Sequence, residues 1–319
     1  MRRMVLTIMS MLVCLAAAPA QAQKAVDSAG LKELTNQPSR KLLFDLIKKA
    51  EDDQAQKDGL EYFNLYGPFR YPNDALYDAI EKKERTDSIF GVDLSHYTSS
   101  KFPFPSLRRK EVKFAYLKAT QGTGFKDGKF TQFWDQLDKL PKHQQVHRGA
   151  YHFLSAQKDA AAQAATYLKF LTAHGGLKKT DMPPVMDLEW DKPNVKGKDR
   201  WEDKTPDQII AATRTWLELV EKSTGRKPMI YTSLAWWRAR VGADRLKEFA
   251  AYPMWIADYS RTARATEAVK MPAGTALALW QYTESATMAA GFEGDFDSNI
   301  FKGTAAHFYK AFDVVPFEP

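Results

Sequence analysis

The sequence predicts an α/β protein whose main domain is a compact barrel of eight strands with an incomplete ring of helices. From Ile89 onward, short β-branched and aromatic runs alternate with helical stretches, which is typical of a mainly parallel sheet. Eight such runs fall between residues 89 and 301, and this density favours a closed barrel over an open sheet. The 319-residue chain, 44% hydrophobic and 27% charged, has the composition of a globular protein.

The first segment, residues 1–22, has the pattern of a cleaved secretory signal. Arg2 and Arg3 precede a short apolar run, and Ala20-Gln21-Ala22 matches the small-x-small pattern of a signal peptidase site. The apolar run is short for a bilayer span, and no later window approaches the roughly 20 apolar residues that a helical span needs. We therefore expect an exported protein, periplasmic or secreted, with no stable membrane insertion.

The chain has one cysteine, Cys14, which lies inside the apolar run and would leave with it. The mature chain would then have no disulfide, no thiolate nucleophile and no cysteine metal site. A lipoprotein is a weaker interpretation, because Val13 precedes Cys14 where a lipobox requires a small residue. The net charge of +7 favours attraction to anionic polymers or surfaces, although solubility alone also explains it.

Residues 23–87 predict a small helical extension that packs on the domain after it. Ser39 can cap a first helix and Asn73 a second, with a Gly- and Pro-containing aromatic loop between them. The polar run Glu81–Asp87 is interpreted as a linker to the domain at 88–319. The apolar positions at helical spacing are Leu43, Leu46, Ile47 and Ala50 in the first helix, and Leu76, Ala79 and Ile80 in the second.

The strands and one helix of the barrel domain have clear signals. The best helix follows Thr205, with Pro206 at its first position, Gln208 completing a capping box and Gly225 as a stop. After Tyr259 and Tyr282 the connections look too short or irregular for full helices. The predicted strands are IFGVDLS, VKFAYLKAT, HRGAYHF, PPVMDLE, PMIYTS, PMWIADYS, ALALWQYT and GDFDSNIF.

Acidic side chains gather at the ends of three predicted strands. Side chains alternate along a strand, so Asp187 and Glu189 share one face. The same alternation sends Asp93 and Ser95 inward on the first strand, and places Asp295, Asp297 and Asn299 together on the last. In a barrel the inward face at the C-terminal strand ends is where enzymes keep their chemistry. We therefore expect three or four carboxyl groups in one pocket.

Converging carboxyl groups suit glycosidic bond cleavage. Like charges and burial raise pKa values, so at least one acid should stay protonated near neutral pH. A protonated acid can donate to the leaving oxygen while an ionised one stabilises or attacks the cationic sugar. The alternatives are ordinary ion pairs with Lys118 or Arg148, or a divalent cation. Acids on three strand ends favour the catalytic interpretation.

Aromatic residues, 13% of the chain, supply flat surfaces on which sugar rings can stack, although core packing is the commoner fate of any one of them. His96 and His152 stand singly beside strand ends and form no metal signature, and phosphate loops and serine-hydrolase elbows are absent. We expect no metal and no cofactor. The aromatic residues at or near strand ends are Tyr97, Tyr151, Phe153, Tyr231, Tyr259, Trp280 and Tyr282.

An ordered series of motifs between Ile89 and Gly303 resembles the family-25 glycoside hydrolases, the Chalaropsis-type lysozymes. The motifs are GVDLSHY, FAYLKATQG, GAYHF, PVMDLEW, PMIYTS, MWIADYS, LWQYT and DFDSNIFKG. The resemblance implies a modified TIM-like β/α barrel that cuts the β-1,4 bond between N-acetylmuramic acid and N-acetylglucosamine in peptidoglycan. Thr98 and Gln121 depart from the family's motifs, and we expect these changes to affect the rim of the site more than its acids.

The resemblance also implies roles for individual residues. Glu189 matches the general acid, and Asp187, Asp93 and Asp297 match the other acids of the site. The expected partners are peptidoglycan glycan strands and no nucleic acid, and we expect a monomer. Positions that match or adjoin the substrate contacts of the family are Tyr151, Lys118, Tyr231, Trp280, Tyr97 and Asp258.

Two other functions stay open at this point. A chitinase-like hydrolase can also use an Asp and a Glu two residues apart on a barrel strand, but its longer run of acids would fall where Pro183, Pro184 and Val185 stand. A catalytically silent module could use the same barrel only to bind cell-wall glycan. Measured turnover, with Glu189→Gln as a control, separates these possibilities.

Overall fold

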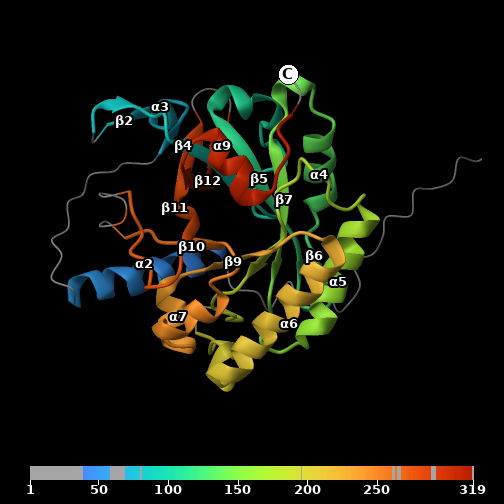
Figure 1. Ribbon diagram of the computed structural model, residues 1–319, viewed down its shortest axis with the longest axis vertical. Coiled ribbons are helices and arrows are strands. Elements are labelled where there is room, and N and C mark those ends of the chain that lie inside the picture. The colour runs from blue at the N-terminus through green and yellow to red at the C-terminus, as the bar shows by residue number, and fades with distance from the viewer. Residues whose placement is uncertain are drawn as a thin grey trace, which may run out of the picture.

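The computed structural model describes residues 39–57, 69–79, 81–194, 196–260, 263, 267–288 and 292–317. Eight of its strands close a barrel, and β12 pairs back onto β4 (Figure 1). Every predicted strand is present, so the predicted barrel is confirmed. In order around the barrel the strands are β4 (Ser88–Leu94), β5 (Val112–Gln121), β7 (His147–Phe153), β8 (Val185–Asp187), β9 (Met229–Thr232), β10 (Met254–Ala257), β11 (Leu277–Met288) and β12 (Phe292–Lys302).

The barrel is mixed, because its last strand runs against both neighbours. Neighbouring pairs from β4 round to β11 are parallel, whereas β12 is antiparallel to β11 and to β4. Residues 289–291 alone separate β11 from β12, and a parallel crossover needs a dozen or more residues. The prediction of a short connection after Tyr282 is confirmed. A short strand, β6 (Phe125–Lys126), adds to β5.

Helices α4, α5 and α6 flank one side of the barrel, and α7 lies near the N-terminal helix (Figure 1). The prediction for α6 is confirmed: Thr205 and Gln208 form a reciprocal capping box, Pro206 is its first residue, and Gly225 ends it with a φ of 65°. The α-helices described in the barrel domain are α4 (Phe130–Asp138), α5 (Ala160–Ala173), α6 (Pro206–Thr224), α7 (Leu234–Arg240) and α9 (Ala305–Phe312). No helix among the described residues is long and apolar enough to cross a bilayer.

Aromatic rings fill the barrel interior below the site. A Cβ on Gly149 would lie 2.2 Å from the Tyr116 ring, and one on Gly91 would lie 2.2 Å from the Phe114 ring. Tyr116 in turn packs against Trp255 with ring centroids 4.9 Å apart. Two strands therefore need glycine, because the space beside their backbones is taken by rings from β5. This packed layer forms the floor on which the acidic residues stand.

The N-terminal extension packs on the barrel, as predicted. Its first helix, α2 (Arg40–Lys57), begins after Ser39, whose Oγ accepts the N–H of Leu42 at 3.2 Å. Ile47 on this helix is fully buried. The next strand, β1 (Arg70–Tyr71), adds to β11 in parallel. The predicted signal segment at 1–22 lies outside the described residues.

The second helix predicted for the extension is wrong. The helix α3 covers only Asn73–Leu76, and Pro72, not Asn73, stands at its N-cap. The chain then becomes extended, and β2 (Tyr77–Asp78) pairs with β3 (Lys83–Glu84) in a hairpin. Side-chain capping of the turn favours this hairpin, because Asp78 accepts the N–H of Glu81 at 3.1 Å. The expected position Ile80 lies outside the described residues.

The run interpreted as a linker, Glu81–Asp87, forms the return strand of this hairpin instead. The Arg85 side chain is 5% exposed and donates to Glu267 at 2.7 Å, while it lies 3.3 Å from Asp78. A guanidinium held by two carboxylates fixes the run against the connection between β10 and β11. The first barrel strand, β4, begins directly after it at Ser88.

Candidate active site

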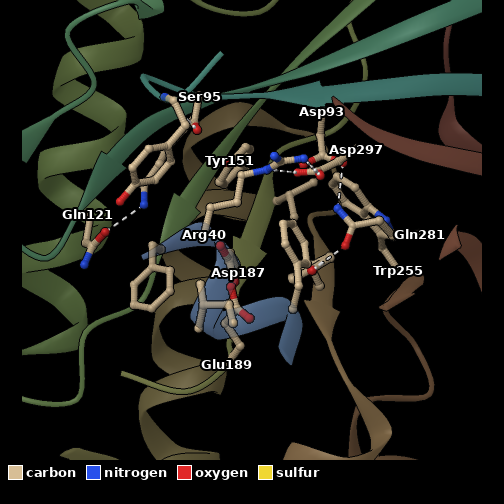
Figure 2. A pocket seen from close by; sticks show the side chains of 17 residues that line it. Arg40, Asp93, Ser95, Gln121, Tyr151, Asp187, Glu189, Trp255, Gln281 and Asp297 are labelled. Atoms are coloured by element: carbon tan, nitrogen blue, oxygen red, sulfur yellow. Dashed lines mark hydrogen bonds and ion pairs between the residues drawn. The ribbon is translucent and has the colours of Figure 1, made fainter. Parts of the chain in front are cut away.

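Four acids meet in one pocket at the C-terminal ends of the parallel strands (Figure 2). Asp93 lies on β4, Asp187 ends β8, and Asp297 lies on β12. Glu189 follows β8 by two residues. Exposure of these residues is only 4% for Glu189 and 9% for Asp297, with the other two between. The structure therefore brings together the four predicted catalytic residues in surroundings that penalise charge.

Asp187 and Glu189 are a buried, interacting pair of carboxyl groups in this pocket. Burial raises the pKa of Asp187 to about 7. Burial, followed by the charge of Asp187, raises the pKa of Glu189 well above its ordinary value. Of the two causes expected from the sequence, burial and like charges, burial is the larger for both acids.

Asp93 and Asp297 form the second acidic pair. They are directly opposite residues of the antiparallel β4–β12 ladder. Asp93 Oδ2 accepts from Gln281 Nε2 at 2.7 Å and from Asn299 Nδ2 at 2.8 Å. Burial raises the pKa of Asp93, and these two amides oppose the rise. Burial and Asp93 raise the pKa of Asp297 as well.

Lys118 supplies a cation beside the acids. Its Nζ donates to Gln121 Oε1 at 2.7 Å and lies 4.9 Å from the Phe153 ring centroid. Burial lowers the pKa of the Lys118 ammonium, while Asp187 and other acids oppose this change. Gln121, one of the two departures from the family motifs, thus orients a basic residue of the pocket. Thr98, the other departure, accepts the N–H of Ser95 at 3.3 Å.

Four of the six predicted substrate contacts line the pocket: Lys118, Tyr97, Tyr151 and Tyr231. The Tyr231 hydroxyl donates to Gln281 Oε1 at 2.6 Å, which links it to Asp93 through one amide. Tyr97 is 48% exposed and packs on the His96 ring, with centroids 4.0 Å apart. Its exposed ring at the pocket is suited to stacking on a sugar.

The other two predicted contacts, Trp280 and Asp258, lie outside the pocket lining. The neighbouring residue Gln281 points to the acids, so Trp280 points the other way, because successive side chains alternate. Trp280 Nε1 donates to the Asp258 carbonyl at 2.8 Å, and Asp258 Oδ1 accepts the N–H of Ser260 at 2.8 Å. Asp295, which shares the predicted face of Asp297, is exposed and also lies outside the lining.

The two histidines near strand ends are bound to other side chains. His96 Nδ1 lies 2.9 Å from Asp127 Oδ2, and His152 Nδ1 lies 2.7 Å from Thr120 Oγ1. Burial lowers the pKa of His152 to about 3, so its ring is neutral near neutral pH. Among the described residues, no group of three or more His, Cys, Asp or Glu could hold a metal ion.

Sequence reasoning missed the wall of the pocket that helix α2 provides. Arg40, Leu43 and Phe44 line the pocket together with the acids. The helical spacing of Leu43 was visible, but no local signal connects α2 to a site formed by distant strands. Gln281 was also missed, although the alternation that places Asp187 and Glu189 on one face would have pointed it inward.

The sequence is similar to those of known proteins. Residues 92–290 match the family model described as glycosyl hydrolases family 25. Lysozyme M1 from Streptomyces globisporus is 29% identical over 228 residues, which is 69% of this chain and 70% of that protein. Uncharacterized protein YegX from Escherichia coli (strain K12) is 28% identical over 208 residues, or 65% of this chain, and the match spans 66% of YegX.

A solved structure has the same barrel. The bacterial lysozyme from Streptomyces coelicolor superposes with a TM-score of 0.61 at 27% identity, covering 72% of this chain and 99% of its own. Nearly all of that lysozyme is matched, whereas more than a quarter of this chain is not. Segments of this chain also lie outside the family match at residues 92–290.

Proposed function

Because this chain belongs to glycosyl hydrolases family 25 and is therefore a glycoside hydrolase, we propose that it is an exported muramidase acting on peptidoglycan. The bond cleaved is the β-1,4 linkage between N-acetylmuramic acid and N-acetylglucosamine. The observation that carries this proposal is the burial of Asp187 and Glu189 in one pocket, which raises the pKa of both carboxyl groups and favours a protonated Glu189. Glycosidic bond cleavage requires such a proton.

Glu189 acts as the general acid. Its raised pKa keeps it protonated near neutral pH, so it can give its proton to the glycosidic oxygen as the bond to the anomeric carbon breaks. The positive charge that develops on the sugar is stabilised by the acids around it, Asp187, Asp93 and Asp297. Their burial strengthens this interaction, because water screens charges poorly inside the pocket.

The nucleophile in this proposal is the substrate itself. The carbonyl oxygen of the 2-acetamido group on N-acetylmuramic acid attacks its own anomeric carbon, and Asp187 orients the acetamide. Water then opens the cyclic intermediate and gives its proton to the Glu189 carboxylate, which restores the acid. Tyr151, Tyr231 and Lys118 hold the sugar, and Tyr97 stacks at the rim.

Export follows from the signal pattern at residues 1–22 and suits a substrate outside the cytoplasm. Incubating the mature protein with purified peptidoglycan and identifying the new reducing ends by mass spectrometry tests the activity. Reducing N-acetylmuramic acid ends are expected, and a substrate lacking the acetamide carbonyl should stay intact. Reducing N-acetylglucosamine ends, cleavage of peptide bonds, or no turnover would each contradict the proposal. Asp295→Asn, an exposed acid on the strand of Asp297, serves as the matched control.

A further inference from the structure

Helix α2 lies outside the segment that matches the family, residues 92–290, yet it forms part of the acidic pocket. Arg40, Leu43 and Phe44 stand at positions i, i+3 and i+4, so they share one face of the helix. All three line the pocket that contains Asp93, Asp187, Glu189 and Asp297. A segment outside the family match therefore lines the pocket that contains the four acids.

Arg40 is the residue of this helix face that binds an acid of the pocket directly. Its Nη2 donates to Asp297 Oδ1 and, at 2.7 Å, to the carbonyl of Glu284, while its Nε lies 3.5 Å from Asp297 Oδ2. Figure 2 shows the Arg40 side chain extending to the Asp93–Asp297 pair. The guanidinium is thus a cation bound to Asp297 and interacting with the charge of Asp93.

The positive charge of Arg40 has the same sign as the charge that develops on the sugar in the transition state. A glycosidic transition state carries positive charge on the sugar ring, and the acids of the pocket are placed to stabilise it. In this structure a guanidinium from the chain itself provides the positive charge that these acids favour. Arg40 therefore stabilises the charged forms of Asp93 and Asp297 before any glycan binds.

The space that a bound glycan needs also indicates competition between α2 and the substrate. The glycosidic oxygen must come within hydrogen-bond reach of Glu189, about 3 Å, with its sugar ring beside the other acids. Arg40, Leu43 and Phe44 form a wall of the pocket that holds these acids, and the Arg40 guanidinium is bound to Asp297. A sugar ring that approached Asp297 from the pocket would therefore compete with this guanidinium for the carboxylate.

The packing of α2 on the barrel is compatible with its release from the pocket. Ile47 is buried, and Phe44 meets the Tyr259 ring edge-on at a centroid distance of 5.5 Å. The opposite face is solvated, with Lys41 and Lys49 paired to Asp45 and Asp53 one turn away. Among the described side chains of α2, an apolar stripe that includes Ile47 and the bonds of Arg40 to Asp297 and to the Glu284 carbonyl hold the helix. A ligand that binds the pocket more tightly than α2 does can displace it.

We propose that α2 is an autoinhibitory segment that fills the glycan site, with Arg40 as its anchor, and that glycan and α2 compete for the four acids. This inference rests on the proposed function, since it assumes that the pocket binds a glycan. Apparent affinity for the glycan is then lowered by the fraction of molecules whose site is covered. Removing the anchor raises that open fraction.

Arg40→Ala tests the proposal in the full mature chain, with soluble oligosaccharides of alternating N-acetylglucosamine and N-acetylmuramic acid as substrate. The expected result is a rise in kcat/KM of at least about 5-fold, mostly through a lower KM. Phe44→Ala should act in the same direction. Lys41→Ala, on the solvated face with a side chain 84% exposed, should match the wild type. A fall in kcat/KM for Arg40→Ala would show that Arg40 positions Asp297, and an unchanged value would also overturn autoinhibition.

Hydrogen exchange gives a readout that does not depend on turnover. In Glu189→Gln, the backbone amides of residues 40–57 should lose protection when the oligosaccharide binds. Retained protection with the oligosaccharide bound would overturn the proposal while leaving the proposed function intact. If neither Glu189→Gln nor Arg40→Ala/Glu189→Gln binds the oligosaccharide, the proposed function itself fails.

Discussion

Glu189 and Asp187, two residues apart in the chain, lie in one pocket where both carboxyl groups are almost fully buried, and the charge of Asp187 raises the pKa of Glu189. The strand β8 ends at Asp187, and the following residues keep Glu189 on the side of the acids. One oxygen of each carboxyl, Asp187 Oδ1 and Glu189 Oε2, is buried with no hydrogen-bond partner. Such an arrangement favours a shared proton over two negative charges.

The shared proton predicts a specific dependence of stability on pH. The folded-state pKa of Asp187 is about 7, against 3.8 for the free side chain, and that of Glu189 is raised also. Between these values the folded protein holds protons that the unfolded chain releases, so this pair destabilises the fold increasingly as pH rises from about 4 to about 7. Replacing one of the two acids by its amide removes that acid's share of this loss.

Urea unfolding at pH 4 and pH 7.5 checks this prediction. The free energy of unfolding of Glu189→Gln, relative to the wild type, should be higher at pH 7.5 than at pH 4, and Asp187→Asn should follow the same trend. Asp295→Asn should track the wild type at both values, because this acid is exposed. A difference between Glu189→Gln and the wild type that does not change with pH would contradict the raised pKa.

The barrel floor provides a second prediction, on stability. In Gly149→Ala the new methyl group would lie 2.2 Å from the Tyr116 ring, so the ring or the strand must move. We expect a loss of about 1–3 kcal/mol in the free energy of unfolding, the usual range for overpacking a core. Gly128→Ala is the matched control, because nothing lies within 4 Å of a Cβ there. Equal stabilities of the two variants would show that the interior is not packed as described.

Much of the fold and of the acidic cluster could be predicted, because both follow from short-range periodicity. Alternation along a strand is a local property, and it placed Asp93, Asp187 and Asp297 on inward faces before any tertiary information. The capping box at Thr205 is equally local, since its partners lie three residues apart. Such signals survive in a single sequence.

The features that could not be predicted depend on contacts between distant segments. Arg40 meets Asp297 across 257 positions of sequence, and no pattern within α2 indicates that partner. The direction of Trp280 depends on which of two neighbouring residues faces inward, and β11 has irregular pairing just beyond Gln281. The hairpin of β2 and β3 was not predicted because Leu76, Ala79 and Ile80 stand at helical spacing. The turn that Asp78 caps ends the helix before that spacing is used.

The most direct test of the central claim compares two leaving groups in Glu189→Gln. A general acid is needed when the departing oxygen is a poor leaving group, as in a glycan, and is hardly needed when it is an acidic phenol. Turnover of peptidoglycan oligosaccharides should therefore fall by roughly 10²–10⁴, the usual contribution of general acid catalysis. Turnover of a dinitrophenyl glycoside of the same disaccharide should fall far less. An equal loss on both substrates, or near-normal activity on the glycan, would contradict the assignment of Glu189 as the proton donor.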